Sequence, residues 1–136
     1  MKQITSYNES QQLAITSSDG FILIIAGAGS GKTTVITHRI AYLIQEKFID
    51  PSQILGLTFT NKAAGEMQDR LARIINKKIA SHVMLCTFHR FCMYVLRREI
   101  HHLGYTKEFS LYDESDVKRL LTVSYTHLTL PTSDLV

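Results

Sequence analysis

The segment from Ala26 to Thr33 reads AGAGSGKT, with three glycines followed by a lysine and a threonine. Phosphate groups carry dense negative charge, and backbone N–H groups can surround them only where no bulky side chain intervenes. Glycine allows that approach, a helix that starts here adds partial positive charge, and the lysine can reach the outer phosphates. The segment therefore predicts a P-loop that binds a nucleoside triphosphate.

Within this loop, Lys32 is expected to contact the β- and γ-phosphates of ATP, and the Thr33 hydroxyl to ligate Mg²⁺. The usual pattern begins with glycine, whereas this chain has Ala26, so tolerance at the first turn is assumed. A dinucleotide-binding loop is disfavoured because the glycine spacing is not G-x-G-x-x-G. The residues expected to surround the nucleotide phosphates are Ala26, Gly27, Ala28, Gly29, Ser30, Gly31, Lys32, Thr33 and Thr34.

The phosphate loop belongs to a repeated pattern that would position it. Three short apolar runs occur along the chain, and each is followed by a stretch with apolar residues at helical spacing. Such alternation predicts an α/β fold with a parallel sheet and flanking helices. The predicted strands are 21–25, 54–59 and 82–86. The predicted helices are 33–46, a second from Thr60-Asn61 to about Lys78, and a third from Phe88 to Ile100 that Gly104 can end.

Composition limits the class of protein. The chain has 136 residues, a net charge of +3 and two cysteines, which suits one globular domain and permits a polyanionic partner. Its longest apolar run, 21–28, is far shorter than the roughly 20 residues of a membrane span, and residues 1–12 lack a signal-peptide pattern. We therefore expect a cytoplasmic protein with no membrane partner.

Three further segments narrow the function: YNESQ at 7–11, TFTNKAA at 58–64 and TFH at 87–89. In this order and spacing, together with the P-loop, they resemble the UvrD/Rep/PcrA family of superfamily 1 DNA helicases from about residue 5 to 122. The resemblance implies an incomplete P-loop NTPase (RecA-like) sheet, ATP and Mg²⁺ as cofactors, and single-stranded and duplex DNA as partners. It also implies 3′ to 5′ unwinding.

The resemblance further implies roles for individual residues. Gln11 would read the adenine edge, and Arg39 would pack on the adenine ring; on the residues alone, both could be surface side chains. Phe59 would stack on a base of single-stranded DNA, with core packing as its alternative. Backbone and base contacts to DNA would come from Phe59, Thr60, Asn61, Lys62, Thr87, Phe88 and His89. Cys86 and Arg90 stand where the family usually has glycine. Zinc binding by Cys86 and His89 is discounted because a second ligand pair is lacking.

Other polar groups receive structural interpretations. Asp113 and Glu114 follow a strand-like run and could be mistaken for the acidic pair that ATP hydrolysis requires. Asp113 is better explained as the N-cap of a helix carrying Val117, Leu120 and Leu121. The segment 105–122 would then begin an inserted subdomain. The basic residues of the second helix, Arg70 and Arg73 among them, are read as a solvated face. His101 and His102 are likewise read as surface residues without a metal-binding partner.

The last residues differ from the rest of the chain. Residues 123–132 can be written in codons that match a sequencing adapter, so we expect 123–136 to be a non-native tail. An extended edge strand or a disordered tail is the alternative.

We expect this fragment to be inactive alone, because the acidic pair and the arginines of a second motor domain are missing. Three alternative functions stay open: a helicase-nuclease subunit, another P-loop NTPase or kinase, and a non-catalytic DNA-binding remnant.

Overall fold

The computed structural model describes residues 7–17, 20–110, 112 and 114–128, which form two compact units, 1–94 and 95–136. The first unit contains a two-stranded parallel sheet made of β1 (Leu55–Thr58) and β2 (Met84–Thr87). Leu55 is paired with Met84 and Thr58 with Thr87, so the two strands end together. Both strands lie within the predicted ranges or one residue beyond them, and the predicted α/β class is confirmed.

The connection between the strands is helical. A short 3₁₀ turn, η2 (Pro51–Gln53), precedes β1, and α3 (Asn61–Ile75) and α4 (Lys77–Ala80) link β1 to β2. The predicted single helix to about Lys78 is thus divided. Asn76 has a φ of 99° and separates the two helices, because its side chain accepts a hydrogen bond from the Lys78 N–H and starts α4.

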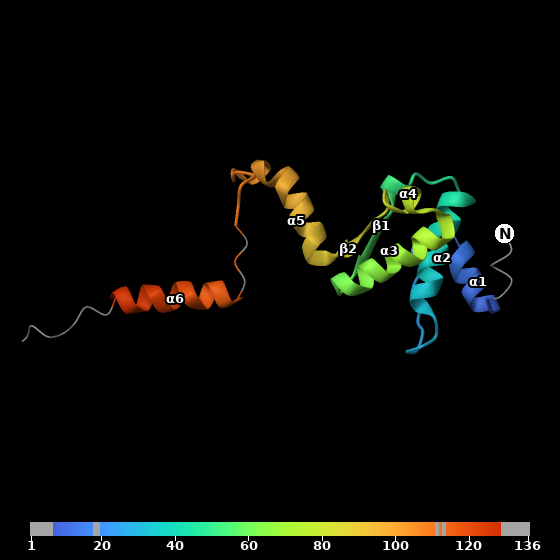
Figure 1. The fold of residues 1–136 in the computed structure, drawn as a ribbon, viewed down its shortest axis with the longest axis horizontal. Helices are drawn as coiled ribbons and strands as arrows, with labels where there is room; N and C mark the ends of the chain where they lie inside the picture. The colour runs from blue at the N-terminus through green and yellow to red at the C-terminus, as the bar shows by residue number, and fades with distance from the viewer. Residues whose placement is uncertain (1–6, 18–19, 111, 113, 129–136) are drawn as a thin grey trace, which may run out of the picture. The chain divides into compact units, whose positions relative to one another are not determined.

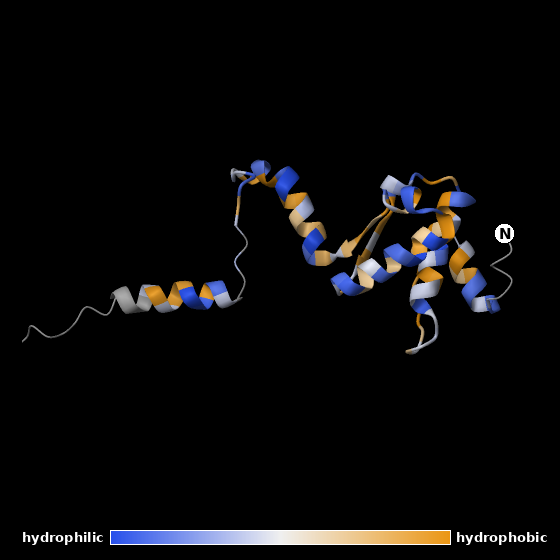
Figure 2. Ribbon diagram, in the orientation of Figure 1, coloured by the Kyte–Doolittle hydropathy of each residue, from blue (hydrophilic) through white to orange (hydrophobic). Residues whose placement is uncertain are grey.

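The core lies around α3, which packs against both strands and against α2 (Lys32–Gln45) (Figure 1). Figure 2 shows both hydrophilic and hydrophobic residues along α3. The buried ones recur at helical spacing on one face: Ala64, Met67, Leu71 and Ile75. Burial of this face supplies the main stabilisation of the unit. The buried cluster consists of Ile40, Ala41, Met67, Leu71, Ile75, Ala80 and Val83. A further helix, α1 (Glu9–Thr16), packs on α2 and is capped by Asn8.

The predicted first strand, 21–25, does not form. None of its residues is in a strand, and Phe21, Leu23 and Ile25 are 110%, 85% and 89% exposed. A strand that is apolar on both faces is stable only with hydrogen-bonded neighbours and helices over both faces. Among the described residues no strand pairs with this segment, so the helix after the P-loop forms without the strand before it.

The second unit contains the end of α5 (Phe88–Glu99), then η3 (Ile100–Leu103) and α6 (Glu114–Leu128). Gly104 follows η3 with a φ of 78°, which confirms the predicted left-handed ending. The predicted cap Asp113 lies outside the described residues. Since α6 continues past Thr122, an extended strand over 123–128 is wrong, and residues 129–136 lie outside the described chain. No helix of the described residues is long and apolar enough to cross a membrane.

Candidate functional site

The phosphate loop, Ala26–Thr33, turns directly into α2 at Gly31, which has a φ of 83° and occupies the N-cap without a side-chain hydrogen bond. Gly29 has a φ of 75°, so both positions use backbone conformations that favour glycine. An N-terminus capped in this way leaves its first N–H groups directed at the loop, the arrangement that binds phosphate.

Lys32 closes the loop. Its Nζ donates hydrogen bonds to the carbonyl oxygens of Ala26, at 2.9 Å, and of Gly27. The Ser30 hydroxyl also donates to the Gly27 carbonyl, at 2.8 Å. These local bonds hold the ammonium group against the first two carbonyl groups of the loop, and its contact with phosphate stays a prediction.

Gln11 lies against the same loop although it is 19 residues away in sequence. Its Nε2 donates to the Ser30 carbonyl at 3.2 Å, while its Oε1 accepts from the Asn8 N–H in the capping box of α1. Gln11 and Ser30 also line a cavity of about 170 Å³, together with Ala26 and Lys32. The structure thus brings Gln11 to the loop; its contact with adenine stays a prediction.

Arg39 lies on α2 and contacts α1, the helix that also carries Gln11. Its Nη1 donates to the Ala14 carbonyl at 2.7 Å and ties α2 to α1. This contact gives the guanidinium a structural role in the described chain, so its packing on adenine stays a prediction. The Thr33 carbonyl accepts from the Thr37 hydroxyl at 2.7 Å, an ordinary intrahelical contact.

Two arginines that were read as a solvated face lie beside the helix of the phosphate loop. Arg70 Nη1 donates to the Thr34 hydroxyl at 3.4 Å, and Arg70 and Arg73 line a cavity of about 370 Å³ between α2 and α3. His38, whose ring lies 3.1 Å from the Tyr7 hydroxyl, lines it as well. Both arginines are exposed, so the predicted solvated face is confirmed, and their spacing places them on one face of α3.

A second site forms where β1 and β2 end. Phe59 follows β1 and is 103% exposed, and Phe88 follows β2 and is 62% exposed. With Leu57, Thr58 and His89 they line a cavity of about 260 Å³, here called the strand-end surface. The parallel register brings the two motifs together, and the core-packing alternative for Phe59 is wrong. Two exposed aromatic rings at one edge suit stacking on unpaired bases.

The polar residues around this surface have distinct positions. The Thr60 hydroxyl accepts from the Ala63 N–H at 3.1 Å and caps α3, while Asn61 and Lys62 are exposed in its first turn. Thr87 is buried, and its hydroxyl accepts from the Arg90 N–H at 3.3 Å. Arg90 therefore lies in the first turn of α5, where its N–H is bonded to the side chain that precedes the helix.

Comparison with known proteins gives consistent matches. The model of the UvrD/REP helicase N-terminal domain matches residues 7–134. The chain is 47% identical over 113 residues to the ATP-dependent DNA helicase PcrA of Bacillus subtilis (strain 168), covering 83% of this chain and 15% of that protein. It is 43% identical over 114 residues to PcrA of Staphylococcus aureus (strain NCTC 8325 / PS 47), covering 84% and 16%. The chain spans about one sixth of the length of these relatives.

Proposed function

Since the chain belongs to the UvrD/REP helicase N-terminal domain family, we propose that it is the N-terminal part of an ATP-dependent DNA helicase. The observation that carries the proposal is that one compact unit holds both required sites. It contains a glycine-rich phosphate loop that Gln11 contacts, and an exposed aromatic surface at two strand ends. A nucleotide site coupled to a sequence-tolerant DNA site is what a translocating motor needs.

At the nucleotide site, the donor set fits a triphosphate with its metal ion. Gly29 and Gly31 adopt the left-handed backbone of a phosphate cradle, and the Lys32 ammonium group lies against the first two carbonyl groups of the loop. In the proposal, Lys32 binds the outer phosphates and the Thr33 hydroxyl holds Mg²⁺, which neutralises charge that develops on the phosphates. Gln11, on α1 and in contact with the loop, orients the adenine, since a carboxamide can donate and accept at a base edge.

At the strand-end surface, Phe59 and Phe88 stack on bases, whatever their sequence. Thr60, Asn61 and Lys62 stand at the N-terminus of α3, where partial positive charge and N–H donors suit the DNA phosphates. Closure of a second motor domain on the nucleotide would move the strand-end surface along the single-stranded DNA. The 3′ to 5′ direction belongs to the proposal.

Domain organisation is proposed on the same basis. Residues up to about 104 supply one motor domain with a RecA-like sheet, and 105–122 begin an inserted subdomain. We assign the acidic pair and the γ-phosphate arginines to the parent protein outside this chain. The chain alone therefore hydrolyses no ATP in this proposal.

The first experiment is to sequence the source DNA across the codons for residues 120–136 and to express the parent protein from it. A reading frame that continues past Thr122 into a different sequence supports the non-native tail, and a reproduced 123–136 followed by a stop contradicts it. The parent should unwind a 3′-tailed duplex with ATP and lose this activity in Lys32→Ala, while Lys47→Ala retains it.

Two results would redirect the proposal. ATP hydrolysis that single-stranded DNA does not stimulate would indicate another P-loop NTPase or kinase. Degradation of the DNA substrate by the parent, in addition to unwinding, would indicate a helicase-nuclease subunit.

A further inference from the structure

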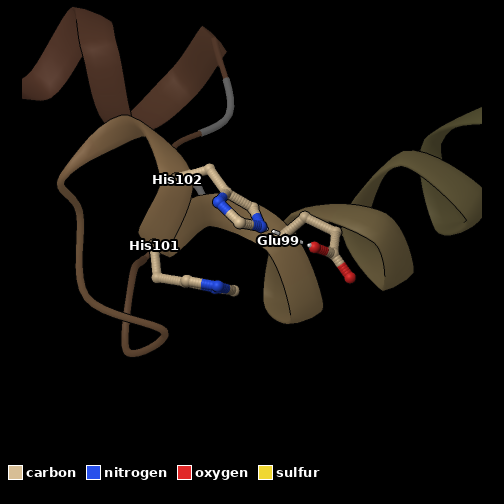
Figure 3. A group of neighbouring side chains, drawn as sticks. All are labelled: Glu99, His101 and His102. Atoms are coloured by element: carbon tan, nitrogen blue, oxygen red, sulfur yellow. Dashed lines mark ion pairs between the residues drawn. The ribbon is translucent and has the colours of Figure 1, made fainter.

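A group of three metal-ligating side chains lies where α5 passes into η3 (Figure 3). It consists of Glu99, His101 and His102, and one ligand atom of each lies within 4.8 Å of the others. Glu99 Oε2 is 3.2 Å from His102 Nε2, and the two imidazole ring centroids are 4.1 Å apart. His101 and His102 are exposed, as the sequence predicted, and Glu99 lies beside them.

The local backbone brings the three together. Glu99 is the last residue of α5, and the chain then tightens into a 3₁₀ turn that Gly104 ends in the left-handed region. Side chains three residues apart eclipse in such a turn, which places His102 over Glu99. Glu99 and His101, two residues apart, are separated by about 120° around the axis of a 3₁₀ turn, compared with about 160° in an α-helix, so the turn brings them closer.

The donor set selects a class of metal. Two imidazole nitrogens and one carboxylate oxygen suit zinc, copper and nickel, whereas magnesium and calcium prefer oxygen ligands throughout. Tetrahedral zinc with bonds of about 2.0–2.1 Å holds its ligand atoms about 3.3 Å apart. The Glu99–His102 separation already has this value, and His101 needs to move by no more than about 1.5 Å, a side-chain rotation at an exposed residue.

We propose that Glu99, His101 and His102 bind one divalent ion of the zinc class at the α5–η3 junction. The carboxylate and the two imidazoles supply three ligands, and water completes the tetrahedron. Because all three side chains are exposed, the ion has open access, and the ligands need little desolvation. The bound ion would also fix the turn between α5 and η3.

Calorimetric titration of the 136-residue chain with zinc chloride, in a buffer containing magnesium, tests the proposal. We expect one zinc ion per chain. The double variant His101→Gln/His102→Gln and the single variant Glu99→Gln should each weaken binding at least about tenfold, the loss that even indirect supporting residues cause in metal sites. The matched control is His82→Gln, since His82 is also an exposed histidine in the described chain.

Chemical shifts of the histidine rings provide a second measurement that does not depend on the variants. On addition of zinc, the ring signals of His101 and His102 should move together, while those of His82 stay in place. The proposal is overturned if zinc does not bind, if the double variant binds it as tightly as the wild type, or if His82→Gln weakens binding equally. Circular dichroism of each variant checks that the helices persist.

Discussion

The strand-end surface and the phosphate loop are built in different ways within the same unit. The strand-end surface stands on β1 and β2, which are paired with each other and backed by the buried face of α3. The phosphate loop follows residues 21–25, which form no strand and are largely exposed. Within the described residues, one site is therefore supported by a sheet, and the other by its local turn, its helix and the contact from Gln11.

This difference separates what the loop conformation requires, which is local, from what holding the loop rigidly requires, which is a paired strand. Gly29 and Gly31 adopt left-handed conformations and α2 starts directly after them, with Lys32 bonded to nearby carbonyls, so these features form without a paired strand before the loop. Holding the loop rigidly requires a paired strand, because an unpaired segment can move with its loop. We infer that the chain binds single-stranded DNA better than it binds nucleotide.

The largest expected effect comes from removing the support of the strand-end surface. Leu71 on α3 is 0% exposed, so Leu71→Ala should lower the free energy of unfolding by about 2–5 kcal/mol. Urea denaturation followed by circular dichroism measures this change. Leu13→Ala, at an exposed site on α1, should change it by no more than about 0.5 kcal/mol. Equal effects at the two sites would mean that α3 is not the centre of the core.

The phosphate loop can be tested through its lysine. Lys32→Ala should weaken binding of a fluorescent ATP analogue at least about tenfold, because hydrogen bonds to charged groups contribute about 1.5–3 kcal/mol. Fluorescence anisotropy measures it, and Lys47→Ala is the matched control near the other end of α2. Unchanged binding in Lys32→Ala would place the nucleotide elsewhere.

Removal of an aromatic ring from the strand-end surface should have an effect on binding that is comparable to or smaller than that of Lys32→Ala. Phe59→Ala should weaken binding of a single-stranded oligonucleotide by about 1–3 kcal/mol, the range for stacking of one base. Phe48 is also exposed, and Phe48→Ala should leave the affinity unchanged. If both variants bind DNA like the wild type, the strand-end surface is not the DNA site.

A smaller effect is expected from the cap that follows β1. Thr60 accepts a hydrogen bond from the Ala63 N–H, so Thr60→Ala should lower the free energy of unfolding by about 1 kcal/mol. Thr60→Ser keeps the hydroxyl and should restore most of the loss. Equal losses in the two variants would show that the threonine methyl group, and not the cap, is what stabilises α3.

The smallest expected effect concerns the turn before β1. Hydrogen bonds from the hydroxyl and the N–H of Ser52 hold the pKa of Asp50 below its ordinary value of 3.8. A carboxyl group with a lowered pKa stabilises the fold above that ordinary value, and the contribution is lost as the pH falls through the folded-state pKa. The difference in urea midpoint between wild type and Asp50→Asn should therefore shrink from pH 6 to pH 2.5. A difference that does not change with pH would exclude the charge as its source.

Sequence patterns predicted the locally determined features well. The N-cap at Thr60, the glycine after η3 and the start of α2 follow from side-chain hydrogen bonds and backbone preferences within a few residues. A parallel pairing of the second and third apolar runs was also predictable, since a helical stretch lies between them in the sequence, and α3 packs against both strands.

The features that apolar periodicity did not predict depend on distant partners or on a change of helix type at one residue. An apolar run such as 21–25 predicts a strand, yet whether it forms depends on neighbours that the run does not specify. The Gln11 contact with Ser30 and the position of Arg70 beside Thr34 arise from the packing of α1 and α3 on α2. The Glu99–His101–His102 group depends on the change from α-helix to 3₁₀ turn at one residue, which periodicity does not resolve.

Titration of the same chain with two ligands tests the central comparison most directly. The ligands are a labelled single-stranded oligonucleotide and a fluorescent ATP analogue with Mg²⁺. We predict saturable DNA binding that weakens as salt increases, and nucleotide binding that is weaker than DNA binding. Tight nucleotide binding without DNA binding would contradict the account, because the phosphate loop would then need no paired strand and the strand-end surface would not bind DNA.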